Sequence, residues 1–282
     1  KTEHLTLKVN PAYRYPGNLS VGERSQRFQR DTMAELLSYA TGCMMGRYSL
    51  DHPGLILADS RESQEAQISV YEGKVSKQIS HTKFKPDKDS IIPVLDGEWF
   101  EDDIVARTRE FLSVTFPEST VTENLRFLED SIGKDIRKYF CKDFYKEHVQ
   151  TYKKRPIYWM VQSPKAGFAC LIYLHRYTPE TLLQVLNDYF RPYVQKLEAR
   201  IALLDLDQLN ESLPKRDQIV ARKEAEKISK VIKECQDWEK EALLPLAQQR
   251  IKLDLDDGVK VNYLKLQDVL AKIPGLTAKK TD

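Results

Sequence analysis

Most hydrophobic positions in the first half of the chain recur at the spacing of α-helices. Three stretches place apolar residues three and four positions apart, over residues 26–47, 99–116 and 136–149. A further short helix is expected between Thr122, a residue type that caps helices, and Gly133, a residue type that ends them. This part of the chain is therefore predicted to be mainly helical.

A longer helical pattern dominates the second half of the chain. The period runs from Thr178 to Leu204, although Pro192 should bend the helix. A second, highly charged helix follows a break at Pro214. Two long helices joined by a short turn predict an antiparallel helix pair.

Two short runs between these helical regions have the character of strands. Residues 156–159 and 169–175 are apolar and rich in aromatic side chains, and a Pro/Gly turn separates them. This pattern predicts a buried β-hairpin. Three consecutive cations, Lys153, Lys154 and Arg155, stand directly before it and give the hairpin a positively charged base.

The combined pattern predicts an α+β fold that is mainly α, with helical segments around a small β-hairpin, followed by a long antiparallel helix pair. Residues 1–58 are expected to form an N-terminal strand, at Leu5–Val9, and a helical segment. Residues 59–90 are polar and predict a loop or mobile hairpin. Helices and the basic hairpin follow over 91–177, and the helix pair with a C-terminal tail occupies 178–282.

Charge is distributed unevenly along the chain, although the net charge is only +2. Residues 87–130 contain twelve acidic residues and four cations, whereas residues 134–155 contain eight cations and three acidic residues. A molecule polarised in this way can bind a polyanion with one face. The alternative is that the two blocks neutralise each other in the folded protein.

The basic region that starts at residue 134 gives the strongest chemical signal. Lysines and arginines neutralise phosphates, and aromatic side chains such as Tyr152 and Tyr158 offer surfaces for stacking or packing. Trp159, in the middle of a strand, is expected in the core. Three of the lysines are four positions apart and should form one stripe on a helix. The predicted phosphate-binding residues are Lys138, Lys142, Lys146, Lys153, Lys154, Arg155, Lys165 and Arg176.

Other classes of site find no support in the sequence. The four cysteines are scattered singly, without the spacing of a zinc or redox site, which indicates a reduced, cytoplasmic protein. No apolar run is long enough to span a membrane. We therefore expect no metal site, no catalytic residue and no membrane contact in this chain.

Several runs together resemble the C-terminal part of the PglX-type adenine-specific DNA methyltransferases of the bacteriophage-exclusion (BREX) defence system. Some of these runs, such as Arg155-Pro156-Ile157-Tyr158-Trp159, are also similar to type IIG-like DNA methyltransferases. The resemblance covers nearly the whole chain and is weakest over 60–90 and 205–240. The runs that carry it are 35–51, 53–55, 92–96, 100–105, 138–145, 153–159, 171–177 and 254–263.

The resemblance implies a longer parent protein that methylates N6 of adenine with S-adenosylmethionine, bound outside this segment. Asn10-Pro11-Ala12-Tyr13 departs by one residue from the Asn-Pro-Pro-Tyr signature of these enzymes and does not inherit its catalytic role. Two functions fit the segment itself. It engages double-stranded DNA and orients it, or it is a protein-docking scaffold for other proteins of the phage-defence system.

Overall fold

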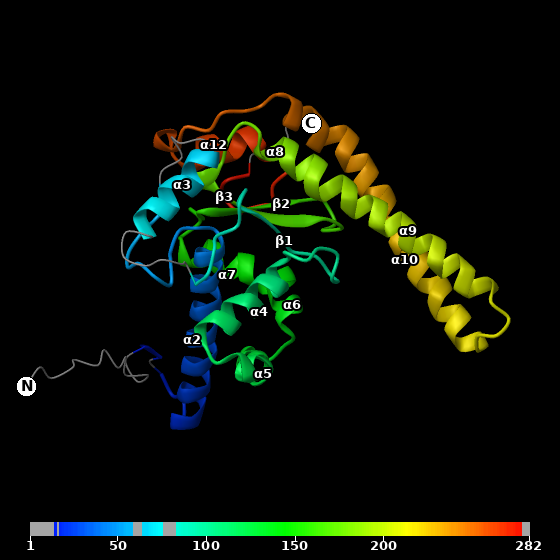
Figure 1. Ribbon diagram of the computed structural model, residues 1–282, viewed down its shortest axis with the longest axis horizontal. Coiled ribbons are helices and arrows are strands. Elements are labelled where there is room, and N and C mark those ends of the chain that lie inside the picture. The colour runs from blue at the N-terminus through cyan, green and yellow to red at the C-terminus, as the bar shows by residue number, and fades with distance from the viewer. Residues whose placement is uncertain (1–13, 16, 59–63, 76–82, 278–282) are drawn as a thin grey trace, which may run out of the picture.

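A small antiparallel β-sheet lies at the centre of the computed structural model, which describes residues 14–15, 17–58, 64–75 and 83–277. The sheet has the order β1-β3-β2, with β1 at Ile91–Pro93, β2 at Tyr158–Gln162 and β3 at Ala169–Tyr173. Strands β2 and β3 form the predicted hairpin, in which Tyr158 pairs with Tyr173. Helices cover both faces of the sheet (Figure 1). The predicted class, α+β and mainly α, is confirmed.

Each face of the sheet contributes to a hydrophobic core of its own. Successive residues of a strand point to opposite faces, so a strand covered on both sides is apolar throughout. In β2, Trp159 and Val161 enter the core under the C-terminal helices, whereas Tyr158 and Met160 enter the core under the N-terminal helices. This two-sided burial explains why the hairpin strands are continuous apolar runs without alternation.

One face is covered by helices from the first part of the chain. The helix α2 begins with a capping box, in which Ser20 Oγ accepts a hydrogen bond from the Glu23 N–H and the Glu23 carboxylate accepts one from the Ser20 N–H. Asp103 caps α4, and Gly133, with φ 73°, ends α5 as predicted. The helices of this face are α2 (Val21–Met44), α4 (Ile104–Thr115), α5 (Val121–Ile132), α6 (Ile136–Tyr139) and α7 (Tyr145–Thr151).

The other face is covered by the predicted antiparallel helix pair and the C-terminal helix α12 (Val259–Leu266). The pair consists of α9 (Arg191–Leu209) and α10 (Lys215–Trp238), and its far end projects from the body of the molecule (Figure 1). Short helices, α8 (Thr181–Gln184) before the pair and α11 (Leu244–Gln248) after it, complete this layer. The antiparallel pair is therefore confirmed as an element of the fold.

Two π-turns allow prolines to stand inside this helical layer. A proline lacks the N–H of a helical residue, and its ring clashes with the carbonyl four positions earlier. For Pro192 and Pro245 those carbonyls belong to Asp188 and Glu241, and both lie in π-turns, at Val185–Phe190 and Glu239–Leu243. The wider π-turn accommodates each proline, so the helix continues through Pro192, where a bend was expected, and through Pro245.

The polar region 59–90 differs from the prediction of a loop or mobile hairpin. Residues Gln64–Val75 form a helix, α3, in which Gln67, Tyr71 and Val75 are buried at four-residue spacing. The prediction is therefore wrong in this part of the region. The strand expected at Leu5–Val9 and the run Asn10–Tyr13 lie outside the described residues. The four-region division of the chain stays a prediction.

Arg176 is buried in the short 3-10 turn that follows β3, although the sequence suggested a phosphate contact. Its side chain is 0% exposed and donates hydrogen bonds to Gln67 Oε1 at 3.0 Å and to three backbone carbonyls. Those carbonyls belong to Met45, Asp87 and Lys88, at 3.3, 2.7 and 2.7 Å. The guanidinium thus joins α3, the end of α2 and the segment before β1. It does not belong to a basic surface, and that prediction is corrected.

A buried carboxyl next to this arginine makes the stability depend on pH. Asp89 accepts hydrogen bonds from the Ile91 N–H at 3.0 Å and the Tyr189 hydroxyl at 2.9 Å. Burial, with the neighbouring Asp87 carboxyl, raises the pKa of Asp89 to about 8. The folded chain therefore keeps a proton that the unfolded chain releases near pH 4. The stability from this group is complete below about pH 4 and is lost as the pH rises through about 8.

Replacing Asp89 by asparagine should remove this part of the pH dependence. The amide has the shape of the protonated acid and cannot ionise, so D89N is expected to lose less stability than the unchanged chain between pH 5 and pH 8.5. Urea unfolding at a series of pH values measures the difference. Stability curves that run parallel for the two proteins would contradict the assignment of a buried proton to Asp89.

Candidate nucleic-acid interface

The C-terminal end of α7 turns sharply through two of the predicted phosphate-binding residues. The Lys154 N–H donates to the Val149 carbonyl at 2.8 Å, and the Lys153 N–H donates to the Gln150 carbonyl at 3.0 Å. These are the two bonds of a Schellman motif, whose turn residue is usually glycine. Lys153 and Lys154 have φ angles of 49° and 65°, in the left-handed region that disfavours side chains. Two lysines therefore occupy strained backbone positions at this turn.

A pocket of about 480 Å³ lies beside the turn. Four of its eight lining residues are lysines and none is acidic. In the described parts of the chain, these lysines form no ion pair with a carboxylate. We call Lys146, Lys153, Lys154 and Lys272 the lysine cluster. The other lining residues, which form a mainly apolar wall, are Tyr145, Val149, Gln150 and Pro274.

The second wall of the pocket is an extended segment near the C-terminus. It runs along the free edge of β2, where the Ala271 N–H donates to the Met160 carbonyl at 2.8 Å. The Tyr263 hydroxyl accepts a hydrogen bond from the Ile273 N–H at 3.2 Å and so fixes the segment against α12. Ile273 is buried, while its neighbours Lys272 and Pro274 are exposed and line the pocket. Both walls are therefore anchored to the sheet.

The structure brings three of the eight predicted residues together in this pocket, namely Lys146, Lys153 and Lys154. Lys272 was not predicted because it is more than a hundred residues from the other three in sequence. Lys154 Nζ nevertheless lies close to the backbone of the second wall, since a Cβ built on Gly275 would stand 3.8 Å from it. Only tertiary contacts along β2 create this cluster.

The remaining predicted cations lie elsewhere. Arg155, Lys138 and Lys142 are exposed, but the π-turn Phe140–Phe144 interrupts the α-helical spacing on which the lysine stripe prediction depended. Lys165 is in the turn at the far end of the hairpin, about 16 Å along β2 from its start. There the Lys165 N–H donates to Glu234 Oε1 at 2.8 Å. The eight predicted residues therefore do not form a single surface.

The acidic and basic blocks of the sequence neutralise each other only in part. Arg137 Nη1 lies 2.6 Å from Asp103 Oδ2, which joins the two blocks directly. Lys134 is paired with Asp143 inside the basic block. Neither of these cations lines the lysine-rich pocket. The lysines of the basic block that line this pocket, Lys146, Lys153 and Lys154, are thus not neutralised by the acidic block.

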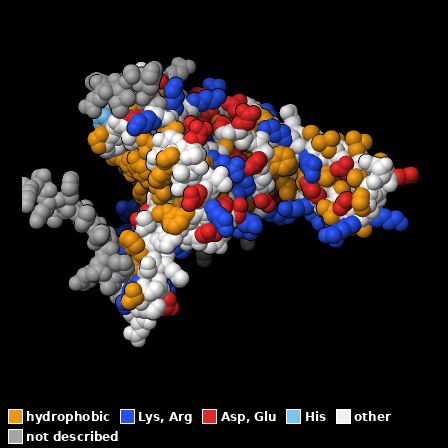
Figure 2. All heavy atoms as spheres, turned by 60° about the horizontal axis from the view of Figure 1, so that its bottom comes forward, with side chains coloured by type: hydrophobic (Ala, Val, Ile, Leu, Met, Phe, Trp, Pro, Cys, Tyr) orange, Lys and Arg blue, Asp and Glu red, His pale blue; other side chains and the backbone are white. Residues whose placement is uncertain are grey.

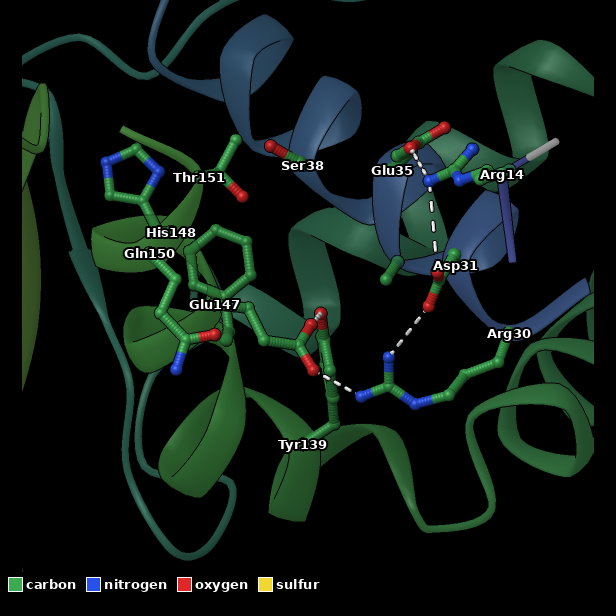
Figure 3. A pocket seen from close by; sticks show the side chains of 12 residues that line it. Arg14, Arg30, Asp31, Glu35, Ser38, Tyr139, Glu147, His148, Gln150 and Thr151 are labelled. Atoms are coloured by element: carbon green, nitrogen blue, oxygen red, sulfur yellow. Dashed lines mark hydrogen bonds and ion pairs between the residues drawn. The ribbon is translucent and has the colours of Figure 1, made fainter. Parts of the chain in front are cut away.

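A second pocket, between α2 and α7, contains both signs of charge (Figure 3). Arg14 lies 2.5 Å from Glu35, Arg30 lies 3.1 Å from Asp31, and Arg30 also pairs with Glu147. Because each arginine already has a carboxylate partner, this pocket offers no unpaired cation to a phosphate. It is a poor candidate for a nucleic-acid contact.

The aromatic side chains near the lysines are mainly structural. Trp159 is 0% exposed and packs edge-on against Tyr263, so it is a core residue as expected. His148 Nε2 accepts a hydrogen bond from the Tyr158 N–H at 3.2 Å and ties α7 to the edge of β2. Burial lowers the pKa of His148 to about 3, so its ring is neutral. It therefore adds no charge to the neighbouring lysines.

At the strained turn, one substitution is expected to change stability and DNA binding in opposite directions. Glycine at position 153 relieves the left-handed strain and removes one positive charge. We expect K153G to raise the free energy of unfolding by up to about 1 kcal/mol. If Lys153 contacts a phosphate, the same change weakens DNA binding. Chemical unfolding of K153G measures the change in stability, and a DNA titration measures the change in affinity. If K153G lost stability as well as affinity, the assignment of backbone strain to Lys153 would be contradicted.

Two further findings concern membrane-spanning helices and metal ligands. None of the described helices is both long and apolar enough to cross a membrane. Among the described residues, no group of three His, Cys, Asp or Glu side chains could hold a metal ion.

Comparison with known proteins shows that the chain is similar in sequence to a segment of adenine-specific methyltransferases. No protein-family model matches it. It is 37% identical over 290 residues to the adenine-specific methyltransferase BrxX of Escherichia coli O9:H4 (strain HS), an alignment that covers 98% of the chain and 23% of BrxX. It is 36% identical over 258 residues to the adenine-specific methyltransferase PglX of Lacticaseibacillus casei (strain Zhang), covering 88% of the chain and 20% of that protein. The resemblance predicted from the sequence is confirmed, and the chain spans about a quarter or less of these relatives.

Proposed function

We propose that this chain is a DNA-engaging and orienting segment of an S-adenosylmethionine-dependent adenine-N6 DNA methyltransferase of a phage-defence system. The observation that carries the proposal is the lysine cluster, in which four cations and no acidic residue line one pocket. The similarity to BrxX and PglX supports DNA as the ligand, because both are named adenine-specific methyltransferases.

The lysine cluster would contact the phosphate backbone rather than the bases. Lysine is a point charge on a flexible stem, which suits phosphate neutralisation better than the bidentate recognition of a base edge. Arg155, Lys138 and Lys142 are exposed and extend the proposed contact beyond the pocket. Lys165 can reach DNA only if the duplex follows the hairpin to its far end. Contacts of this kind position the DNA and leave the reading of sequence to other residues.

The methyl-transfer chemistry would lie outside this segment. Doubly wound folds bind nucleotide cofactors where a strand of a parallel sheet leads through a glycine-rich turn into a helix. The sheet of the described residues is antiparallel and its strands are not connected in this way. We propose that the cofactor and the catalytic signature belong to another part of a longer cytoplasmic protein. The segment would hold the DNA while that part acts on the adenine.

A salt titration tests the proposed DNA contact. Each neutralised phosphate adds about −0.9 to the slope of log affinity against log salt concentration. If about five phosphates are contacted, the slope for this chain and a duplex should lie at about −4 to −5. A flat response would contradict a phosphate contact.

A second candidate function is docking of another protein of the same defence system. The far end of α9 and α10 carries exposed apolar side chains, which Figure 2 shows between charged groups on the projecting arm. These side chains are Leu203, Leu206, Leu209, Ile219 and Val220. Exposed apolar clusters commonly mark protein interfaces. If docking is the function, serine at Leu206 and Leu209 prevents assembly with the partner protein and leaves DNA affinity unchanged.

A further inference from the structure

The lysine-rich pocket has an apolar interior that phosphate contacts alone do not need. Its wall includes the ring of Tyr145 and the side chains of Val149 and Pro274, with the four lysines around them. A volume of about 480 Å³ is in the usual range for small-molecule sites. A ligand that fits this chemistry has a compact apolar or aromatic body and carries negative charge.

Contacts with the rest of the fold hold both walls of the pocket in place. Tyr145 and Val149 lie one turn apart on α7 and pack against the core that holds the C-terminal helices. The opposite wall is fixed by the hydrogen bonds of Ala271 and Ile273 to β2 and α12. Burial raises the pKa of Tyr145, so its phenol stays neutral and does not repel an anion. The shape therefore does not depend on a ligand to form it.

We infer that this pocket binds a single nucleotide unit, with the base against Tyr145, Val149 and Pro274 and phosphates on the lysines. The inference rests on the proposed function, which supplies DNA as the ligand. It adds that one unpaired base of the DNA enters the pocket. Lysines stand on both walls, since Lys153 and Lys154 lie in the turn that follows α7 and Lys272 lies on the C-terminal segment. A strand that inserts one base presents a phosphate on each side of it. A base inside an intact duplex cannot enter, because its faces are stacked on its neighbours.

Variants that fill the pocket without changing charge test this inference. Val149→Trp and Pro274→Trp block it from opposite walls, and Pro274 is exposed, so the second variant should fold even if the first does not. Val261→Trp, on the exposed side of α12, is a matched control. Thermal unfolding of each variant checks the fold. The probes are a labelled short oligothymidylate, thymidine 5′-monophosphate, inorganic phosphate and a blunt duplex.

We expect either filling variant to bind the oligothymidylate at least about fivefold more weakly, the effect of losing one stacked base. The control should stay within about twofold, and duplex affinity should not change in any variant. Thymidine 5′-monophosphate should bind more tightly than inorganic phosphate. If only the oligothymidylate responds to filling, the nucleotide comes from a strand; if the mononucleotide responds equally, a free nucleotide is a ligand as well. If the filling variants bind the oligothymidylate and the mononucleotide as tightly as the unchanged chain does, and duplex binding persists, the inferred nucleotide site is wrong. The proposed function would be unaffected by that result.

Discussion

Replacing Arg176 by methionine is expected to lower the free energy of unfolding by about 3–5 kcal/mol. The change removes a guanidinium that makes four hydrogen bonds in the interior, three of them to backbone carbonyls. Each acceptor left unpaired away from water costs about 1–3 kcal/mol. Methionine keeps much of the volume, so the loss reflects the missing donors more than a cavity. Lysine at the same position reaches only part of these acceptors and should destabilise the chain nearly as much.

Urea unfolding followed by circular dichroism measures this loss. Lys142→Met is the matched control, since Lys142 is exposed, and its effect should stay within about 0.5 kcal/mol. R176M that unfolds within 1 kcal/mol of the unchanged chain would show that the hydrogen bonds of Arg176 do not hold α3 and the segment before β1 in place.

Removing the charge of the lysine cluster is expected to have the largest effect on DNA binding. With glutamine at Lys146, Lys153, Lys154 and Lys272, the affinity for a duplex should fall at least about 100-fold at 0.1 M salt. The reason is that four phosphates keep their counterions instead of releasing them. Since all four side chains are exposed, the fold should be retained.

The helix pair provides a control with the same change of net charge. Lys223, Lys227, Lys230 and Lys233 are also exposed, and all lie on α10. Glutamine at these four positions should leave duplex affinity within about threefold. An equal loss of affinity in both variants would mean that binding follows net charge and not the lysine cluster.

Features that depend on local pattern were predictable from the sequence. The hairpin follows from two apolar runs around a Pro/Gly turn, and the helix pair follows from a long period interrupted at Pro214. The limits of elements were less certain. The capping box at Ser20 and Glu23 starts α2 several residues before its first regular apolar position, so hydrophobic spacing places the start of the helix too late.

Features that depend on burial of polar groups were missed. The buried face of α3 consists of Gln67, Tyr71 and Val75, and hydrophobic spacing does not count the polar Gln67. Arg176 has the sequence character of a surface cation, yet the three backbone carbonyls that surround it come from two distant segments, at residue 45 and at residues 87–88. Lys272 joins the lysine cluster only because the C-terminal segment pairs with the edge of β2. Such contacts are set by the tertiary structure.

The salt dependence of duplex binding tests the central claim most directly. Fluorescence anisotropy of one labelled duplex, from 50 to 300 mM salt, compares the unchanged chain with the two fourfold glutamine variants. If the lysine cluster contacts phosphates, its variant should lose about 3.6 from the magnitude of the slope, while the α10 variant keeps the slope of the unchanged chain. Identical slopes for the unchanged chain and the cluster variant would contradict the assignment of DNA binding to this pocket.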